Sequence, residues 1–241
     1  MDDILKVTGL NKSYDNFSLK DVSFTLPEGC ITGFIGVNGA GKTTTLRSIL
    51  GLTSRISGHI NFFGMDIEKD ARKIKDRIGV VLDDGCFYDE LSLAEMKDVI
   101  ASAYSAWSER DFKEYLERFE LSPKQKINTL SKGMKMKYAL ALALSHNAEL
   151  LIMDEPTIGI DIGAKREIYQ LVGSLVQDGH SVIFISSYLP ELMGVADRVI
   201  VFHEGRLMKE LSGEDLRAMP SSKTEELILS YASGYHEGIG G

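Results

Sequence analysis

The sequence predicts an α/β fold in which a mainly parallel sheet is flanked by helices, with an antiparallel β part and an inserted helical segment. Short, almost continuously apolar stretches recur towards both ends of the chain, as in parallel strands that are buried on both faces. Helical patterns alternate with several of these stretches. From about residue 91 to residue 145 the strand patterns stop, and three helical patterns follow one another. The core is therefore expected to be interrupted by a helical subdomain.

Five strand patterns and one helical pattern are predicted before residue 90. The third strand pattern, CITGFIG, is nearly all apolar, which indicates a strand covered on both faces. A glycine-rich loop follows it, and then the helical pattern KTTTLRSILG at residues 42–51. The strand patterns cover residues 4–10, 18–26, 30–36, 58–64 and 77–82.

The insertion is predicted to hold three helices, each with a recognisable boundary. Ser92 with Glu95 forms a capping box at the start of the first helix, and Ser108 with Asp111 is a weaker version of the same device at the second. Pro123 marks the break before the third helix. The three patterns cover residues 92–107, 108–121 and 132–146.

Strand patterns return after the insertion. A helical pattern at residues 164–179 separates two apolar strands, and a hairpin around Glu204-Gly205 follows them. The segment 224–234 is expected to form a short helix. The two apolar strands and the hairpin cover residues 149–154, 180–186 and 198–211. We therefore expect one domain over residues 1–241, with a core of about 1–90 and 146–215, a helical insertion of about 91–145 and a tail of about 216–241.

Composition is typical of a soluble globular protein, with 44% hydrophobic and 26% charged residues. No apolar run approaches the ~18–20 residues that span a bilayer, and the acidic start MDDILKV does not resemble a signal peptide. We therefore expect the protein to stay inside the cell. The net charge of −8 argues against a nucleic-acid partner, because such proteins usually carry a basic footprint.

The stretch GVNGAGKT, residues 36–43, fits the phosphate-binding pattern G-x-x-x-x-G-K-[ST], known as Walker A. Glycines let backbone N–H groups turn towards a phosphate, Lys42 reaches the β- and γ-phosphates, and the Thr43 hydroxyl can bind Mg²⁺. The helix that follows directs its positive N-terminus at the same anion. The core is therefore predicted to be a P-loop NTPase. Its predicted nucleotide-binding residues are Gly36, Val37, Asn38, Gly39, Ala40, Gly41, Lys42, Thr43 and Thr44.

The second half of such a site is a strand that ends in a carboxylate, and LLIMDEP supplies one. Four apolar residues precede Asp154, which would hold Mg²⁺ through water. Glu155 follows and can polarise the attacking water as a general base. Two acidic residues that simply cap a strand would look the same, and the phosphate loop is what favours the functional interpretation.

The stretch LSKGM, residues 130–134, resembles the signature motif LSGGQ of ATP-binding cassette (ABC) transporters. Ser131 and Gly133 are kept, whereas Lys132 and Met134 depart from the motif. The resemblance implies that Ser131 and Gly133 complete the ATP site of a second cassette, identical or different, in a head-to-tail dimer. The same serine also fits an ordinary helix N-cap, and the two interpretations do not compete.

Other stretches resemble landmarks of the same family, in the same order along the chain. Tyr14 resembles the aromatic residue that stacks on adenine, and IGID, residues 158–161, resembles the D-loop. Asp83 stands in place of the Q-loop glutamine, where it can still contact Mg²⁺. Tyr188 stands in place of the switch histidine. The resemblance implies that Tyr188 takes part in catalysis with Lys42 and Glu155, and that hydrolysis is slow.

The implied protein is the nucleotide-binding subunit of an ABC transporter, closest in character to bacterial exporters of drugs, peptides and antibiotics. Its implied cofactors are ATP and Mg²⁺. Its implied partners are a second cassette and a separate polytopic membrane permease, which would place it on the cytoplasmic face of the cell membrane. Two alternatives stay open: an ABC ATPase that drives a non-transport partner complex, and a nucleotide-binding switch subunit with weak hydrolysis.

Overall fold

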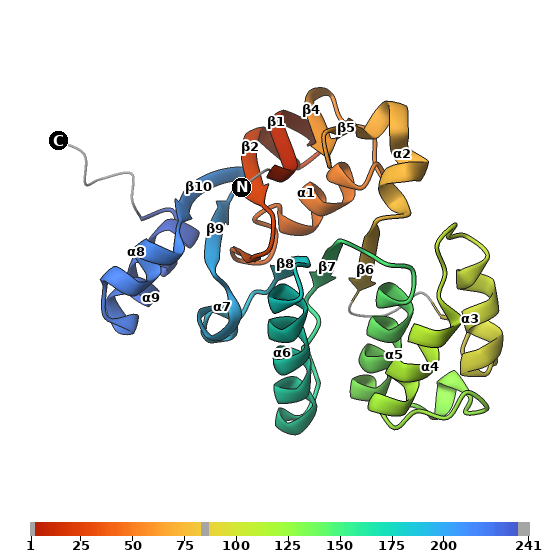
Figure 1. Cartoon of the computed structure of the whole chain (residues 1–241). Coiled ribbons are helices and arrows are strands. Elements are labelled where there is room, and N and C mark those ends of the chain that lie inside the picture. The colour runs from red at the N-terminus through yellow and green to blue at the C-terminus, as the bar shows by residue number, and fades with distance from the viewer. Residues whose placement is uncertain (1–2, 83–86, 236–241) are drawn as a thin grey trace. The chain divides into compact units, whose positions relative to one another are not determined.

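A computed structural model describes residues 3–82 and 87–235 of the chain (Figure 1). By its internal contacts the chain divides into two compact units. The first unit comprises residues 1–74 and 183–241, and the second comprises residues 75–182. Both units combine strands with helices, so the predicted α/β class is confirmed.

The first unit contains an antiparallel sheet with the strand order β2-β1-β4-β5. Its long β1 strand buries the apolar residues Ile4, Leu5, Val7 and Leu10, while polar residues between them face outwards. This alternation is typical of a sheet that covers a core with one face. The strands are β1 (Asp3–Tyr14), β2 (Phe17–Pro27), β4 (Ser57–Phe62) and β5 (Met65–Asp66).

A second group of strands in this unit includes two, β3 and β9, that are buried over most or all of their length. Strand β3 (Ile31–Ile35) runs parallel to β9 (Arg198–His203), and β10 (Arg206–Leu211) pairs antiparallel with β9. All five residues of β3 are buried, which agrees with its continuous apolar pattern. Helix α1 (Lys42–Ile49) follows β3 after the glycine-rich loop.

Short helices complete the first unit. Helix α7 (Leu189–Val195) packs on β3, where the Leu192 side chain lies close to Gly33. The C-terminal helices lie beside β9 and β10 (Figure 1), and the His203 ring makes a 2.9 Å hydrogen bond to the Ala232 carbonyl. The remaining helices are α2 (Ile67–Lys75), α8 (Gly213–Ala218) and α9 (Ser221–Ala232).

The second unit contains the parallel pair β6 (Ile78–Leu82) and β7 (Leu150–Asp154). Helix α5 (Lys132–Leu144) packs on β6 and is buried around most of its circumference. The Tyr138 hydroxyl on α5 donates a 2.8 Å hydrogen bond to the Leu93 carbonyl, and burial raises the pKa of this phenol. The other helices are α3 (Leu93–Ala101), α4 (Glu109–Arg118), η1 (Ile127–Thr129) and α6 (Ile162–Gln177).

Strand β8 (Ser181–Ile185) is divided between the units. In the second unit, the Ser181 N–H donates to the Glu149 carbonyl at 2.9 Å. In the first unit, the Ser186 N–H donates to the Phe34 carbonyl at 3.1 Å. Within the described residues, no helix is both long enough and apolar enough to cross a membrane.

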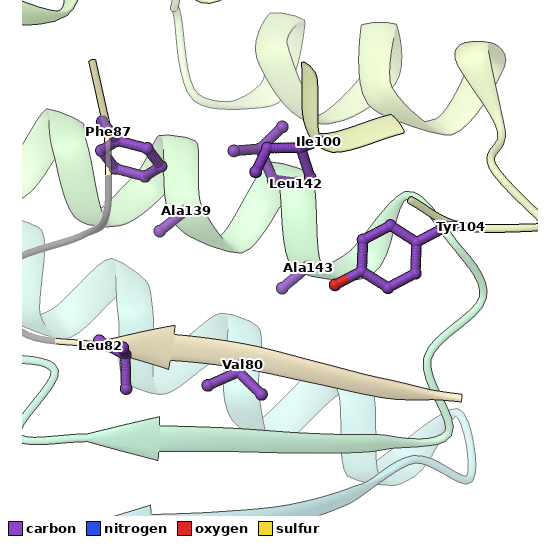
Figure 2. A pocket seen from close by; sticks show the side chains of 8 residues that line it. All are labelled: Val80, Leu82, Phe87, Ile100, Tyr104, Ala139, Leu142 and Ala143. Atoms are coloured by element: carbon purple, nitrogen blue, oxygen red, sulfur yellow. The ribbon is translucent and has the colours of Figure 1, made fainter. Parts of the chain in front are cut away.

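An apolar cavity of about 160 Å³ lies in the second unit (Figure 2). Side chains from β6, α3 and α5 line it, and Phe87 and Tyr104 contribute aromatic rings. The Phe87 ring also packs against Tyr138, with ring centroids 5.3 Å apart. The lining residues are Val80, Leu82, Phe87, Ile100, Tyr104, Ala139, Leu142 and Ala143.

Candidate nucleotide site

The predicted phosphate loop has a backbone that strongly favours glycine at two positions and leaves no space for a side chain at a third. Gly39 and Gly41 have φ values of 84° and 111°, in the left-handed region. A Cβ atom at Gly36 would lie 2.5 Å from the Phe202 carbonyl oxygen, and one at Gly41 would lie 2.9 Å from Leu19 Cδ2. The glycines of the motif are therefore required by the folded chain itself. A cradle of this kind fits a phosphate group, because backbone N–H groups can converge where no side chain intervenes.

Lys42 is the first residue of α1 and lies inside this loop. It is only 6% exposed, and its Nζ donates a 2.7 Å hydrogen bond to the Gly36 carbonyl. Burial of an ammonium group is costly unless strong partners surround it. The loop therefore concentrates one positive charge next to the N-terminus of α1, where anions are favoured. Thr43 follows it on the first turn and is exposed.

The first unit also holds the two predicted aromatic residues of the site. Tyr14 ends β1 and is 47% exposed, and the Lys12 ammonium lies 4.9 Å from its ring centroid. A base that stacks on this ring would have to use the face opposite the lysine. Tyr188 precedes α7 as its N-cap residue and is 61% exposed. Its N–H donates a 3.1 Å hydrogen bond to Ser186 Oγ.

The second unit holds the predicted carboxylates. Strand β7 ends at the buried Asp154, and the chain turns sharply after it. Glu155 has a φ value of 49°, in the left-handed region that residues other than glycine seldom occupy. Backbone strain of this kind clusters at functional sites. Asp83, the third predicted Mg²⁺ ligand besides Thr43 and Asp154, lies outside the described residues.

The predicted signature stretch forms the start of α5, also in the second unit. Ser131 is the N-cap, and its Oγ accepts a 3.2 Å hydrogen bond from the Met134 N–H. Gly133 faces α6, since a Cβ there would lie 3.2 Å from Ala164 Cβ. The Lys132 side chain passes close to Gly159, whose missing Cβ would lie 3.5 Å from Lys132 Cδ. The structure thus brings the signature stretch and the predicted D-loop into contact.

The fold and the phosphate loop define a nucleotide-binding α/β protein of the P-loop class. A family model described as ABC transporter matches residues 19–158, which is more than half of the chain. The chain therefore belongs to the ABC transporter family, whose ATP-binding subunits hydrolyse ATP with Mg²⁺.

Curated relatives include a bacitracin transport protein and ribose import proteins. The chain is 37% identical over 221 residues to the bacitracin transport ATP-binding protein BcrA of Bacillus licheniformis, and the match covers 90% of this chain and 72% of the relative. It is 36% identical over 231 residues to the ribose import ATP-binding protein RbsA of Lactococcus lactis (strain IL1403). That match covers 89% of this chain but only 46% of the relative, so the chain spans about half the length of RbsA.

Solved structures agree with this assignment. A structure described as the ATP binding subunit of an ABC transporter superposes with a TM-score of 0.83 at 26% identity, covering 94% of this chain and 99% of the other. The cbiO1 protein of Clostridium perfringens, part of the ABC transporter complex cbiONQ, gives a TM-score of 0.78 at 26% identity. This match covers 95% of this chain and 96% of cbiO1.

Proposed function

We propose that this ATPase powers a separate membrane permease, and that ATP draws two cassettes together so that each ATP lies between one phosphate loop and the opposing LSKGM. The observation that carries the proposal is the loop at residues 36–43, with its obligatory glycines and its buried Lys42. The signature resemblance at the start of α5 supports the dimer. Hydrolysis then reopens the pair.

Each predicted residue has a role in this proposal. Lys42 contacts the β- and γ-phosphates, and Tyr14 stacks on adenine. Glu155 acts as the general base towards water. Ser131 and Gly133 contact the γ-phosphate bound by the opposing cassette. Mg²⁺ supplies charge compensation when bound, and Thr43, Asp83 and Asp154 are the residues proposed to hold it or its water shell.

Replacement of Glu155 by glutamine tests the dimer. Glutamine keeps the shape of the side chain and cannot accept a proton from water, so the closed state should accumulate. We expect Glu155→Gln with Mg-ATP to elute as a dimer on gel filtration, and the wild type mainly as a monomer. The measurement is elution volume with multi-angle light scattering, with and without nucleotide.

The matched control is Glu226→Gln, which removes the same charge from an exposed position on α9. It should behave like the wild type. If Glu155→Gln stays monomeric with ATP, the result counts against the sandwich of two identical cassettes, and the proposal then survives only with a different chain as the second cassette.

Export is the direction that we propose. The support is the overall resemblance to bacterial exporters together with the match to a bacitracin transport protein. Similar matches to ribose import proteins mean that the direction of transport needs a direct measurement.

The membrane partner is tested separately. Co-purification of the tagged chain from membranes should recover a polytopic permease, which would also place the chain on the cytoplasmic face. Recovery of a non-membrane complex instead would favour an ABC ATPase with a non-transport partner.

A nucleotide switch with weak hydrolysis is the second candidate, and Tyr188 is the observation that favours it. The phenol can donate a hydrogen bond to a γ-phosphate oxygen but carries no positive charge. Loss of one preorganised donor in an active site costs about 10²–10³ in rate. Since tyrosine keeps a donor, we expect a smaller deficit, so Tyr188→His should raise steady-state turnover roughly tenfold to a hundredfold.

The control is Tyr188→Phe, which keeps the ring and removes the hydroxyl. It should hydrolyse ATP more slowly than the wild type, with the permease present in all three assays. Three equal rates would show that Tyr188 plays no part in catalysis.

A further inference from the structure

We propose that the turn Glu204-Gly205, which joins β9 to β10, is a positioning element of the nucleotide site and fixes the direction of a phosphate-binding N–H group in the loop. The proposal rests on the proposed role of residues 36–43 in phosphate binding. All of the residues that carry it belong to the first unit.

The turn is hydrogen-bonded to the phosphate loop on one side and to β2 on the other. The Gly205 N–H donates to the Ala40 carbonyl oxygen at 2.9 Å. The Gly205 carbonyl oxygen accepts from the Lys20 N–H at 2.8 Å. Strand β2 lies at the edge of its sheet, so its outward N–H group is available for such a contact. The turn therefore ties the loop to a strand of the antiparallel sheet.

The contact is between backbones, with no room for a side chain. Glu204 and Gly205 have φ values of 43° and 75°, as in the tight two-residue turns of hairpins. A Cβ at Gly205 would lie 1.8 Å from the Ser18 carbonyl oxygen. A Cβ at Gly41 would lie 3.3 Å from the Gly205 Cα. Glycine is thus required on both sides of this contact.

The geometry of the peptide group links this contact to the direction of the Gly41 N–H. The Ala40 carbonyl and the Gly41 N–H belong to one planar trans peptide, so they point in opposite directions. Because Gly205 holds the Ala40 carbonyl on its own side, the Gly41 N–H is directed to the opposite side. A loop that turns its N–H groups towards an anion must find other partners for its carbonyls. The hairpin turn is that partner for Ala40.

The test compares two alanine substitutions with the same backbone strain. Gly64 also has a φ value of 75°, but nothing lies within 4 Å of its missing Cβ. Gly205→Ala should lower ATP affinity roughly tenfold or more, since a hydrogen bond to the loop is displaced. Gly64→Ala should stay within about twofold of the wild type. Calorimetry with Mg-ATP measures both.

Affinity for AMP separates positioning from a general loss of structure. AMP lacks the β- and γ-phosphates that the loop cradles, so its affinity should change little in Gly205→Ala, and the ratio of ATP to AMP affinity should fall. A folded Gly205→Ala variant with the wild-type ratio would overturn the proposal. A wild type that binds no ATP would instead overturn the assignment of the phosphate loop.

If Gly205→Ala does not fold, hydrogen exchange of the wild-type protein tests whether the turn is coupled to the phosphate loop. Mg-ATP should slow exchange in peptides that cover residues 199–211 as well as in the loop, and leave the turn at residues 62–65 unchanged. Equal exchange at residues 199–211 with and without Mg-ATP would contradict the proposal.

Discussion

The starts of α1 and α5 are the two helix ends that the sequence predicts to bind phosphate, and they are built in opposite ways. At α1 the N-cap is Gly41, with a φ value of 111° and no side-chain cap. At α5 the N-cap is Ser131 in an extended conformation, with its Oγ accepting from the Met134 N–H. Each helix begins with a lysine, but Lys42 is buried whereas Lys132 is half-buried against Gly159.

The difference indicates which of the two motifs the fold itself constrains more tightly. The start of α1 is shaped by main-chain contacts, so a change at a glycine meets a rigid carbonyl or a left-handed backbone. The start of α5 is shaped by a serine cap, which tolerates other side chains at the next positions. Lys132 and Met134 depart from the family motif at positions where the fold permits it.

Alanine in place of Gly36 should have the largest effect. Its Cβ would lie 2.5 Å from the Phe202 carbonyl oxygen, and overpacking against backbone costs about 1–3 kcal/mol. We expect ATP affinity to fall by about a hundredfold. In Gly133→Ala the nearest atom is Ala164 Cβ at 3.2 Å, so ATP affinity of the isolated subunit should stay within about threefold. Equal losses in fluorescence titrations would abolish the contrast between the two helix ends.

The next largest difference in ATP affinity is expected between alanine substitutions of Lys42 and Lys132. Lys42→Ala removes a charged contact to phosphate, worth about 1.5–3 kcal/mol, and should weaken ATP binding roughly tenfold to a hundredfold. Lys132→Ala changes the same residue type at the same helical position and should leave binding to the isolated subunit unchanged. Calorimetry on both variants measures this. An unchanged affinity in Lys42→Ala would refute the assigned site.

Loss of the Ser131 cap is the smallest of the expected effects. It should lower stability slightly and should also reduce dimer assembly. Ser131→Ala should cost about 1 kcal/mol of the free energy of unfolding, or a fall of about 2–4 °C in Tm. Ser108→Ala removes the equivalent cap from α4 and should cost about the same. Only Ser131→Ala should reduce ATP-dependent dimerisation in the Glu155→Gln background. Equal dimer fractions in light scattering would leave Ser131 as a cap alone.

The strongly patterned parts of the fold could be predicted from the sequence. The capping box of Ser92 and Glu95 is confirmed, as is the short C-terminal helix. No sequence pattern predicts helix α7, although Pro190 lies at its start, where proline fits a helix. It is short and its stabilisation comes from packing on β3, which no local pattern reveals.

Contacts between distant segments set the limits of prediction. The first helix of the insertion was expected to reach residue 107 but ends at Ala101. Beyond that point the Tyr104 ring stacks on His146, with centroids 3.7 Å apart, and Ser105 hydrogen-bonds to Asp76. Likewise, the sequence indicates a turn at Glu204-Gly205 but not its partner Ala40. The assignments of the individual residues to the site, among them Asp83, Glu155 and Tyr188, stay predictions.

Because Glu155 has a left-handed backbone, thermal stability and catalytic turnover favour different residues at this position. A side chain in that conformation costs about 1–2 kcal/mol that glycine would avoid. Glycine there would relieve this backbone strain and would remove the carboxylate that we propose as the base. A laboratory lineage screened only for survival at high temperature should therefore drift towards inactive proteins at this position. A lineage screened for turnover has to find its gains in stability elsewhere in the chain.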